Sequence, residues 1–376
     1  MKKRIEGLDA LRGFALFGIL VANMLHFQYG NITFDSIQPD TWWDKFAFYF
    51  TKIAVEGSFY PIFGFMFGYG IIQFVRSLEN RELKTRGPLW RRAIGLMVLG
   101  GLHIALIWDG DILLTYGSGL LIFMLFIKRK VRTLLIWASI LILIFIPLGA
   151  LKTGMLSQLL PSTTELTEIY SSGTYWEVVQ YRIGNFEEFT GFMLLLLAIF
   201  IPIILGFISI FSFVIVGPFV LLGMASGKVN LFAAIEGNTN RFKQLSLLVP
   251  LGLVLKSMLY WDHFIGQALY TAGTYVLAIG YIALFMWVFN LMKERRVTKS
   301  FANLGRMSLT NYLMQSVICT MIFYGYGLGM FGQLGVALGV ALAIVIFILQ
   351  LMLANWYAKR FAIGPVEWVL RKFVYL

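Results

Sequence analysis

Two apolar stretches of the sequence each carry an arginine and, further along the same stretch, polar side chains that could do chemistry. In RRAIGLMVLGGLHIALIWDGDILLTYG, His103 follows Arg92 by eleven residues, which is about three helical turns, so the two share a helix face. Asp109 and Asp111 come shortly after. An imidazole whose tautomer and basicity are set by a carboxylate is suited to act as a general base. The plainer alternative is a histidine bonded to a backbone carbonyl, with the two aspartates capping the next helix.

The opening stretch, RIEGLDALRGFALFGILVANMLHF (residues 4–27), has a similar arrangement. Asn23 lies eleven positions after Arg12 and returns to within about 20° of it, at about 100° per residue. His26 lies about 40° to the other side, and Asp9 is placed to form an ion pair with Arg12. The stripe extends roughly 16 Å, which suggests a polar path across a membrane. The alternative is an Asp–Arg pair that anchors the helix, with Asn23 bonding a neighbouring helix.

Other stretches carry weaker signals. Glu56 precedes GSFYPIFGFMFGYG, whose glycines allow close helix approach. In NLGRMSLTNYLMQS, Arg306 lies near one end, and Asn311 and Gln315 are one turn apart, a spacing that ordinary interhelical hydrogen bonds also explain. His263 falls in a short connection, where exposure is the simplest account. No Gly-rich phosphate loop or zinc-ligand spacing occurs, so the candidate chemistry rests on the two stretches above.

The composition of the chain indicates whether these residues lie in a soluble or a membrane protein. Hydrophobic residues make up 59% of the 376 residues, charged residues make up 13%, and the mean hydropathy is +0.78. A soluble domain carries roughly a quarter charged residues, so this is an integral membrane protein. The cations behind the net charge of +12 cluster between apolar runs, which indicates topology signals and contact with anionic lipid. Nucleic-acid binding therefore has no support. A single cysteine and three histidines leave little room for a metal site, so no metal is expected.

Ten stretches are apolar enough to cross a bilayer, at about eighteen to twenty residues per span. They are 8–27, 57–76, 89–108, 112–127, 132–151, 190–226, 244–261, 264–292, 303–324 and 333–357. The region 190–226 is ambiguous, since one helix of that length would extend roughly 55 Å against a core of about 30 Å. It holds either more than one crossing or one crossing plus a segment in the interface.

The basic residues decide the orientation of these spans. With MKKR inside, the other basic connections also fall inside, while 28–45, 109–111, 152–189 and 262–263 fall outside. One crossing by 190–226 preserves this alternation, with Pro202 and Pro218 as kink or boundary points. The sequence thus predicts an all-α, polytopic transmembrane helical bundle of about ten spans. Residues 1–376 form a single integral membrane domain with both termini cytoplasmic, and 152–189 is an extracytoplasmic segment.

Several blocks of the sequence resemble the YeiB-like family of bacterial membrane proteins, a domain family of uncharacterised function. The blocks are RIEGLDALRGFALFGILVAN, RRAIGLMVLGGLHIALIWDGDILLTY, GRMSLTNYLMQS, YGYGLGMFG and GPVEWVLR, in order along the chain. The start R-x-x-x-LD-x-x-RG-x-A also resembles the wider transmembrane acyltransferase superfamily, which includes heparan-alpha-glucosaminide N-acetyltransferase. This second resemblance is confined to the first spans. Together they imply a multi-pass protein of the bacterial plasma (inner) membrane, surrounded by membrane lipids.

The superfamily resemblance implies an activity. Its members bind acetyl-CoA or another acyl-CoA from the cytoplasmic side and pass the acyl group to an acceptor on the far side. The glycan-modifying branch has an arginine, ten residues and a catalytic histidine, where this sequence has Arg12 and Asn23. Asparagine cannot act as a base, but the glucosaminide branch has asparagine at the matching position and its histidine further along. Here His26 and His103 compete for that role, and the nearby Asp111 favours His103.

A hypothesis for the site follows from the spacing and the resemblance together. The arginines at the inner surface are expected to bind the phosphates of acyl-CoA, a role suited to guanidinium groups. They are Arg12, Arg91, Arg92 and Arg306. His103, held by Asp111, would deprotonate a hydroxyl or amine of a small-molecule, glycan or lipid acceptor, and Asn23 would donate to the developing oxyanion.

Two other classes of function fit the same pattern. A transporter or exporter of a small molecule or lipid-linked metabolite also explains ten spans with polar groups at mid-depth. Against it, the two halves of the sequence contain no matching pair of broken helices, which is the best pointer to an alternating-access site. A membrane scaffold without chemistry is the third class. The sequence specifies neither the acceptor nor the oligomeric state.

Overall fold

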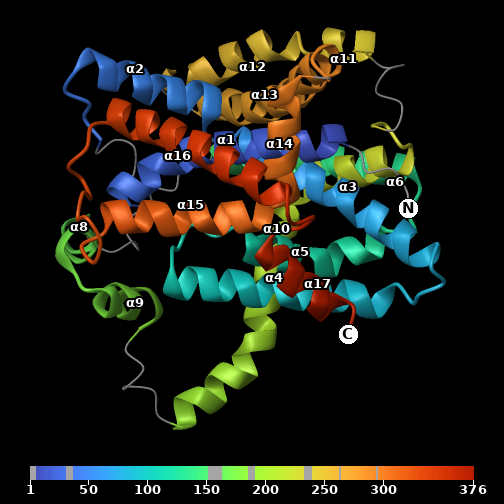
Figure 1. The fold of residues 1–376 in the computed structure, drawn as a ribbon, viewed down its shortest axis with the longest axis horizontal. Helices are drawn as coiled ribbons and strands as arrows, with labels where there is room; N and C mark the ends of the chain where they lie inside the picture. The colour runs from blue at the N-terminus through green and yellow to red at the C-terminus, as the bar shows by residue number, and fades with distance from the viewer. Residues whose placement is uncertain are drawn as a thin grey trace.

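The protein is described by a computed structural model that covers residues 6–30, 37–150, 163–184, 191–232, 239–261, 264–293 and 295–376. Throughout these residues the regular structure is helical and no strand occurs (Figure 1). The helices are α1 (Glu6–Tyr29), α2 (Trp42–Phe50), the π-helical turn η2 (Thr51–Val55), α3 (Phe59–Glu79), α4 (Arg86–Leu106), α5 (Leu113–Phe123), the 3₁₀ turn η3 (Met124–Phe126), α6 (Val131–Ala150), α8 (Thr163–Ser172), α9 (Tyr175–Ile183), α10 (Gly191–Lys228), α11 (Thr239–Leu245), α12 (Leu248–Ser257), the 3₁₀ turn η6 (Met258–Tyr260), α13 (Phe264–Leu291), α14 (Arg296–Arg306), α15 (Ser308–Phe323), α16 (Val336–Ala358) and α17 (Pro365–Val374). The predicted all-α helical bundle is confirmed.

Eight helical segments within the described ranges are long and apolar enough to cross a membrane. They are Glu6–Tyr29, Trp42–Glu79, Arg86–Leu106, Val131–Ala150, Ile203–Lys228, Thr239–Tyr260, Phe264–Leu291 and Val336–Ala358. A shorter apolar helix covers Leu113–Phe126. The chain is therefore a membrane protein with transmembrane helices, and the count of ten crossings stays a prediction.

Two predicted spans differ from the observed helices. The stretch 303–324 is interrupted at Met307, whose backbone (φ −114°, ψ 36°) leaves the helical region, so α14 ends and α15 begins there. The stretch 57–76 corresponds to α3, which a turn at residues 56–58 joins to η2 and α2. Thr41 caps the start of α2 by accepting a 3.2 Å hydrogen bond from the Asp44 backbone N–H. Periodicity alone identified neither boundary, since both depend on backbone geometry at single residues.

The ambiguous region 190–226 corresponds to one helix. α10 extends without a break for 38 residues, and Pro202 and Pro218 lie within it. One continuous helix excludes a division into three crossings. Figure 1 shows the N-terminal part of α10 extending away from the packed helices, while its later part packs against α3, α5 and α6.

The first helix lies at the centre of the bundle. α1 is the most buried of the eight long apolar segments, and it contacts α3, α13, α14, α15 and α16. Its side chains Leu11, Ala15 and Leu16 are fully buried, so apolar residues surround the polar stripe predicted from the sequence. The bundle therefore places the stripe in its interior, where polar groups need partners from neighbouring helices.

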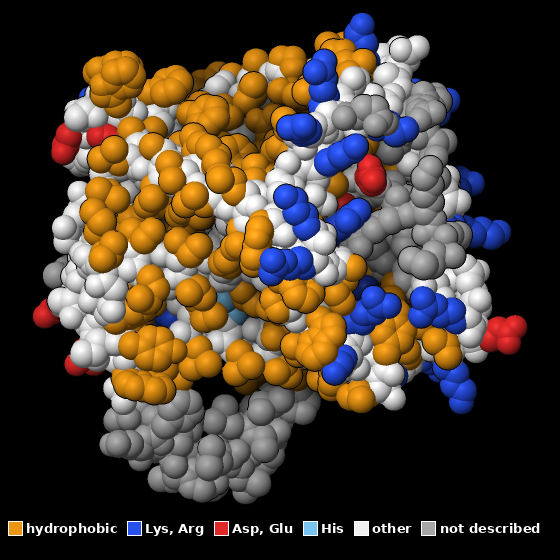
Figure 2. Space-filling view, in the orientation of Figure 1, with side chains coloured by type: hydrophobic (Ala, Val, Ile, Leu, Met, Phe, Trp, Pro, Cys, Tyr) orange, Lys and Arg blue, Asp and Glu red, His pale blue; other side chains and the backbone are white. Residues whose placement is uncertain are grey.

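Basic residues gather at one end of the molecule. On the face drawn in Figure 2, Lys and Arg side chains cluster toward the end at which Figure 1 places α17, and α8 and α9 lie at the opposite end. This distribution is what the positive-inside rule would give for a bundle with its basic end in the cytoplasm.

The predicted outer segment contains two short helices, α8 and α9. Thr174 caps α9 in a reciprocal arrangement with Glu177, and hydrogen bonds from the Thr174 backbone and side chain lower the pKa of the Glu177 carboxyl. Residues 152–162 and 185–190 of this segment, and His263, lie outside the described residues.

Candidate functional site

Two cavities lie inside the bundle and share one wall. The first has a volume of about 220 Å³ and is lined by arginines; we call it the arginine cavity. Its charged lining residues are Arg12, Arg92, Arg306 and Glu367. The second has a volume of about 370 Å³, and we call it the carboxylate cavity after Glu56 and Asp111. Ile112 and Tyr312 line both cavities.

Three different helices bring their arginines to the arginine cavity. Arg12 comes from α1, Arg92 from α4 and Arg306 from the end of α14. Asp9 lies between two of them: its carboxylate accepts a 3.1 Å hydrogen bond from Arg12 Nη1, and its second oxygen is 3.9 Å from Arg306 Nε. The predicted ion pair of Asp9 with Arg12 is thus present, and it extends to a residue almost 300 positions away.

The close contact of α14 with α1 explains how Arg306 reaches Asp9. A Cβ placed on Gly305 would lie 1.8 Å from the Asp9 carbonyl oxygen, so only glycine allows the two backbones to approach this closely. Any larger residue at this position would push α14 outward and carry Arg306 with it.

Neighbouring arginines of α4 have different surroundings. The Arg92 guanidinium lies over the rings of Phe67 and Phe74, with 5.6 Å and 5.3 Å to their centroids, and lines the arginine cavity. Arg91 instead donates a 3.0 Å hydrogen bond from Nε to the backbone carbonyl of Val374, at the end of α17. Of the four arginines expected to bind phosphates, Arg91 is the one that does not line this cavity.

The C-terminal helix α17 forms one side of the arginine cavity. Glu367 accepts hydrogen bonds from the backbone N–H groups of Leu309 (2.7 Å) and Thr310 (3.2 Å) and from the Thr310 hydroxyl (2.5 Å). A carboxylate at a helix N-terminus satisfies unpaired donors and the helix dipole, so Glu367 caps α15. Three guanidinium groups therefore lie near two carboxylates, Glu367 and Asp9. Glu367 is hydrogen-bonded to α15 and Asp9 is paired with Arg12. The excess of positive charge suits a phosphate-bearing ligand.

The carboxylate cavity gathers polar side chains from several parts of the bundle. Asn23 and His26 come from the C-terminal half of α1, Glu56 from the turn between η2 and α3, and Asp111 from the connection between α4 and α5. The remaining polar lining residues are Tyr60, Thr115 and Tyr312. Asn23 and His26 thus share a cavity with Asp111, whereas Arg12, from the same stripe of α1, opens to the other cavity.

His103 is paired with Asp111. Its Nδ1 is 2.8 Å from Asp111 Oδ1, and both side chains are fully buried. Asp111 Oδ2 accepts a 2.6 Å hydrogen bond from the backbone N–H of Leu114, so the carboxylate both orients the imidazole and caps α5. Since a carboxylate accepts, we assign the proton to Nδ1 and the lone pair to Nε2, which has no hydrogen-bond partner among the described residues.

Tyr312 separates His103 from both cavities. The ring centroids of His103 and Tyr312 are 5.4 Å apart, and His103 itself does not line either cavity. The Tyr312 hydroxyl donates to the Gly110 carbonyl (3.1 Å) and accepts from the Ile112 backbone N–H (3.3 Å). It therefore fixes the connection that carries Asp111, and the His103 ring lies against the Tyr312 ring that forms part of the shared wall.

The amides of α15 are structural. Asn311 donates to the backbone carbonyls of Leu304 and Met307, bridging the break before α15. Gln315 donates a 2.9 Å hydrogen bond to Gln350 of α16. These contacts match the interhelical alternative given by the sequence.

Comparisons with known proteins place the chain in a family. A family model described as "Protein of unknown function (DUF418)" matches residues 226–376. The "Uncharacterized protein YxaH" of Bacillus subtilis (strain 168) is 31% identical over 392 residues, which cover 100% of this chain and 95% of YxaH. The "Uncharacterized protein YeiB" of Escherichia coli (strain K12) is 28% identical, over 97% of this chain and 94% of YeiB. The chain belongs to the YeiB-like family. An "Uncharacterized 39.9 kDa protein in amylase 3'region" of Bacillus acidopullulyticus is 27% identical over 100% of this chain and 95% of its own length.

The family model covers only part of the site of this YeiB-like protein. Residues 226–376 contain Arg306, Tyr312 and Glu367, whereas α1, α3 and α4, which supply the other walls, precede them. The full-length relatives match both parts. The family membership predicted from the sequence blocks is thus confirmed.

Sequence reasoning missed three residues around the site of this YeiB-like chain. Tyr312 and Glu367 carry no signal, because a tyrosine in an apolar run and a glutamate in a surface helix are common. Lys256 could have been found, since a lysine within LVPLGLVLKSMLY is an ionisable residue in a predicted span. The structure brings Lys256 against the turn that carries Glu56.

Proposed function

We propose that the protein is a membrane-embedded acyltransferase that moves an acyl group from cytoplasmic acyl-CoA to a hydroxyl or amine acceptor on the outer side of the bacterial plasma membrane. The observation that carries this proposal is the pair of cavities of opposite charge that share Ile112 and Tyr312. A histidine with a carboxylate partner lies directly behind that shared wall.

The arginine cavity fits the donor. Arg12, Arg92 and Arg306 converge from three helices, and Arg306 Nε is buried without a hydrogen-bond partner in the described part of the chain. Guanidinium groups bind phosphate oxygens through paired, charge-assisted hydrogen bonds. Bound acyl-CoA, commonly acetyl-CoA in the superfamily that the sequence resembles, would supply an activated thioester.

His103 provides the base in this proposal, which requires the Tyr312 ring to move aside so that the acceptor can reach the imidazole. Nε2 then accepts the proton of the acceptor hydroxyl or amine as the acceptor's oxygen or nitrogen forms a bond to the thioester carbonyl carbon. The carbon–sulfur bond breaks, and His103 returns the proton to the sulfur. Asp111 keeps Nδ1 protonated and stabilises the imidazolium. Asn23, which lines the carboxylate cavity, donates to the carbonyl oxygen as negative charge develops there.

The test is acyl transfer in membranes that contain the full-length protein. With labelled acetyl-CoA, His103→Ala and Asn23→Ala are expected to lower incorporation of label by about a hundredfold or more. His263→Ala, the third histidine, is the matched control. Full activity of both variants would overturn the assignment of His103 and Asn23.

Two further measurements separate the alternatives. His26→Ala addresses the other histidine, because His26 lines the carboxylate cavity directly. A loss confined to His26→Ala would transfer the role of base to His26. Substrate flux across the membrane without consumption of acyl-CoA would instead support a transporter.

A further inference from the structure

The backbone geometry of the turn that carries Glu56 determines the position of the Glu56 side chain. The π-helical turn η2 ends at Val55, and the Glu56 backbone (φ −54°, ψ 137°) leaves the helix. Gly57 follows with φ +72°, a left-handed conformation that glycine adopts without strain, and α3 begins two residues later. This break turns the chain at the rim of the carboxylate cavity, which Glu56, Gly57 and Tyr60 line.

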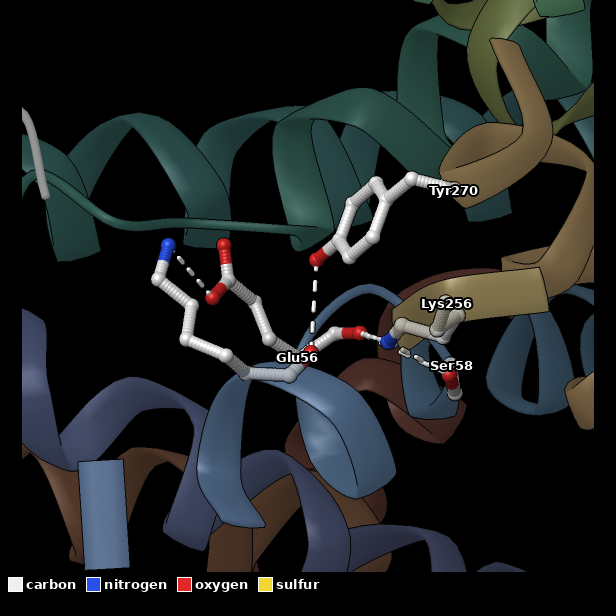
Figure 3. A network of polar contacts seen from close by, with 5 residues as sticks. Glu56, Ser58, Lys256 and Tyr270 are labelled. Atoms are coloured by element: carbon white, nitrogen blue, oxygen red, sulfur yellow. Dashed lines mark hydrogen bonds and ion pairs between the residues drawn. The ribbon is translucent and has the colours of Figure 1, made fainter. Parts of the chain in front are cut away.

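A buried lysine holds this turn in place. The Lys256 side chain, from α12, is fully buried, and its Nζ donates to the Glu56 backbone carbonyl and, at 3.1 Å, to the Ser58 hydroxyl (Figure 3). Nζ also lies 5.0 Å from the centroid of the Tyr270 ring. Burial of a lysine amine is costly unless its donors are satisfied, and these two hydrogen bonds meet that need. Its contacts fix the backbone of the turn and leave the Glu56 carboxylate unengaged by Lys256.

A second lysine orients the carboxylate. Lys52, one helical turn earlier, places Nζ 3.0 Å from Glu56 Oε2, and its side chain is 4% exposed against 22% for Glu56. In Figure 3 a dashed line joins one Glu56 carboxylate oxygen to the nitrogen of this lysine. Glu56 is therefore paired with Lys52 through one oxygen, and its partly exposed side chain lies on the cavity wall.

The charge of the cavity wall identifies the chemistry of a ligand. None of the described residues that line the carboxylate cavity is Lys or Arg, and His26 is the basic side chain among them. Asp111 is occupied by His103 and by the Leu114 backbone N–H. A carboxylate oxygen accepts hydrogen bonds and has no proton to donate to an anion, so Glu56 favours a hydroxyl or ammonium group over an anionic group.

We propose that Glu56 is a binding residue for the acceptor, which presents a hydroxyl or ammonium group rather than an anionic group to it, and that Lys256 positions Glu56. This inference rests on the proposed function, because that function makes the carboxylate cavity the acceptor side.

Equilibrium binding of three matched probes to the purified full-length protein tests this proposal without acyl-CoA. The probes are 3-amino-1,2-propanediol, glycerol and glycerate, which share a three-carbon skeleton and differ in charge. The amine and glycerol are expected to bind saturably, and glycerate is expected not to bind. Glu56→Gln should weaken binding of the amine by about tenfold or more, as loss of a hydrogen bond to a charged group predicts. Glu79→Gln, at the other end of α3, is the matched control.

Further variants keep the test decisive if Glu56→Gln does not fold. The double variant Lys52→Met with Glu56→Gln removes both members of the ion pair and should show the same loss of amine binding. Lys256→Met should reduce the preference for the amine over glycerol, a selectivity that a purely structural role would leave unchanged.

Two results would overturn the inference: binding of glycerate as tight as that of the amine, or unchanged amine binding in Glu56→Gln and in the double variant. Acyl transfer that depends on His103 but not on Glu56 would reject this inference alone. Probe binding that depends on Glu56 without any acyl transfer would reject the proposed function alone.

Discussion

The arginine cavity and the carboxylate cavity share the side chains of Ile112 and Tyr312, yet their walls carry opposite charge. Arg12, Arg92 and Arg306 line the first, and Glu56 and Asp111 line the second. The difference lies in how each group of charges is stabilised. The arginines lie against carboxylates and aromatic rings, whereas the carboxylates are held by lysine, histidine and backbone N–H groups.

One helix contributes to both cavities. α1 presents Arg12 to the arginine cavity and Asn23 and His26 to the carboxylate cavity. The contrast therefore arises from the elements that line each cavity together with α1. For the arginine cavity these include α4, α14 and α17, and for the carboxylate cavity the turn before α3 and the connection after α4. This arrangement is consistent with the proposed binding of an anionic donor on one side of the shared wall and a non-anionic acceptor on the other.

The largest expected effect tests whether Asp111, which lines the carboxylate cavity and pairs with His103, differs in role from the nearby Asp109. Asp111→Asn should lower the rate of acyl transfer by about a hundredfold to ten-thousandfold, because it removes the acceptor that keeps His103 in the required tautomer. Single-turnover transfer with labelled acetyl-CoA measures this. Asp109→Asn, two residues away, is the control, and equal losses in the two variants would contradict a special role for Asp111. The thermal midpoint of each variant reports whether the loss of the α5 cap also matters.

A smaller expected effect tests whether the arginine cavity binds CoA, by comparing substitutions of the adjacent residues Arg92 and Arg91. Arg92→Gln should weaken binding of CoA by about tenfold to a hundredfold, since it removes charge-assisted hydrogen bonds to phosphate. Arg91→Gln should leave the affinity nearly unchanged, because Arg91 bonds Val374 and does not line the cavity. Equal effects of the two substitutions on the measured Kd would show that the cavity is not the CoA site.

The shared wall is tested by Tyr312→Phe. The substitution keeps the ring and removes the hydroxyl that bonds Gly110 and Ile112, so the connection that carries Asp111 loses two contacts. Each such hydrogen bond contributes about 1 kcal/mol, which predicts a fall in transfer rate of about fivefold if one bond matters and about thirtyfold if both do. The Kd of CoA should change little. An unchanged rate with a weakened Kd would assign Tyr312 to the donor side alone.

The smallest effect concerns stability of the arginine cavity. Glu367→Ala removes the cap of α15 and should lower the free energy of unfolding by about 0.5 to 2 kcal/mol, a typical cost for a lost helix cap. Thermal unfolding of the purified protein measures this. Glu79→Ala is the exposed control, and an equal shift in both variants would argue against capping by Glu367.

The sequence by itself determined the class of the fold and the local geometry of its polar stripes. Apolar runs of about twenty residues specify membrane helices, because lipid offers no partner for an open backbone. Helical periodicity placed Arg12, Asn23 and His26 on one stripe of α1. The short separation of His103 and Asp111 along the chain was enough to suggest their pairing, which the structure contains.

Tertiary structure alone decided which of these faces meet. Arg91 and Arg92 are equivalent in the sequence, but a rotation of about 100° directs one to α17 and the other to the cavity. Nothing in the sequence brings Arg306 to Asp9 or Lys256 to Glu56, because these contacts join helices about 200 or more residues apart. The physical reason is that periodicity fixes the direction of a side chain only relative to its own helix, whereas its partners depend on how the helices pack.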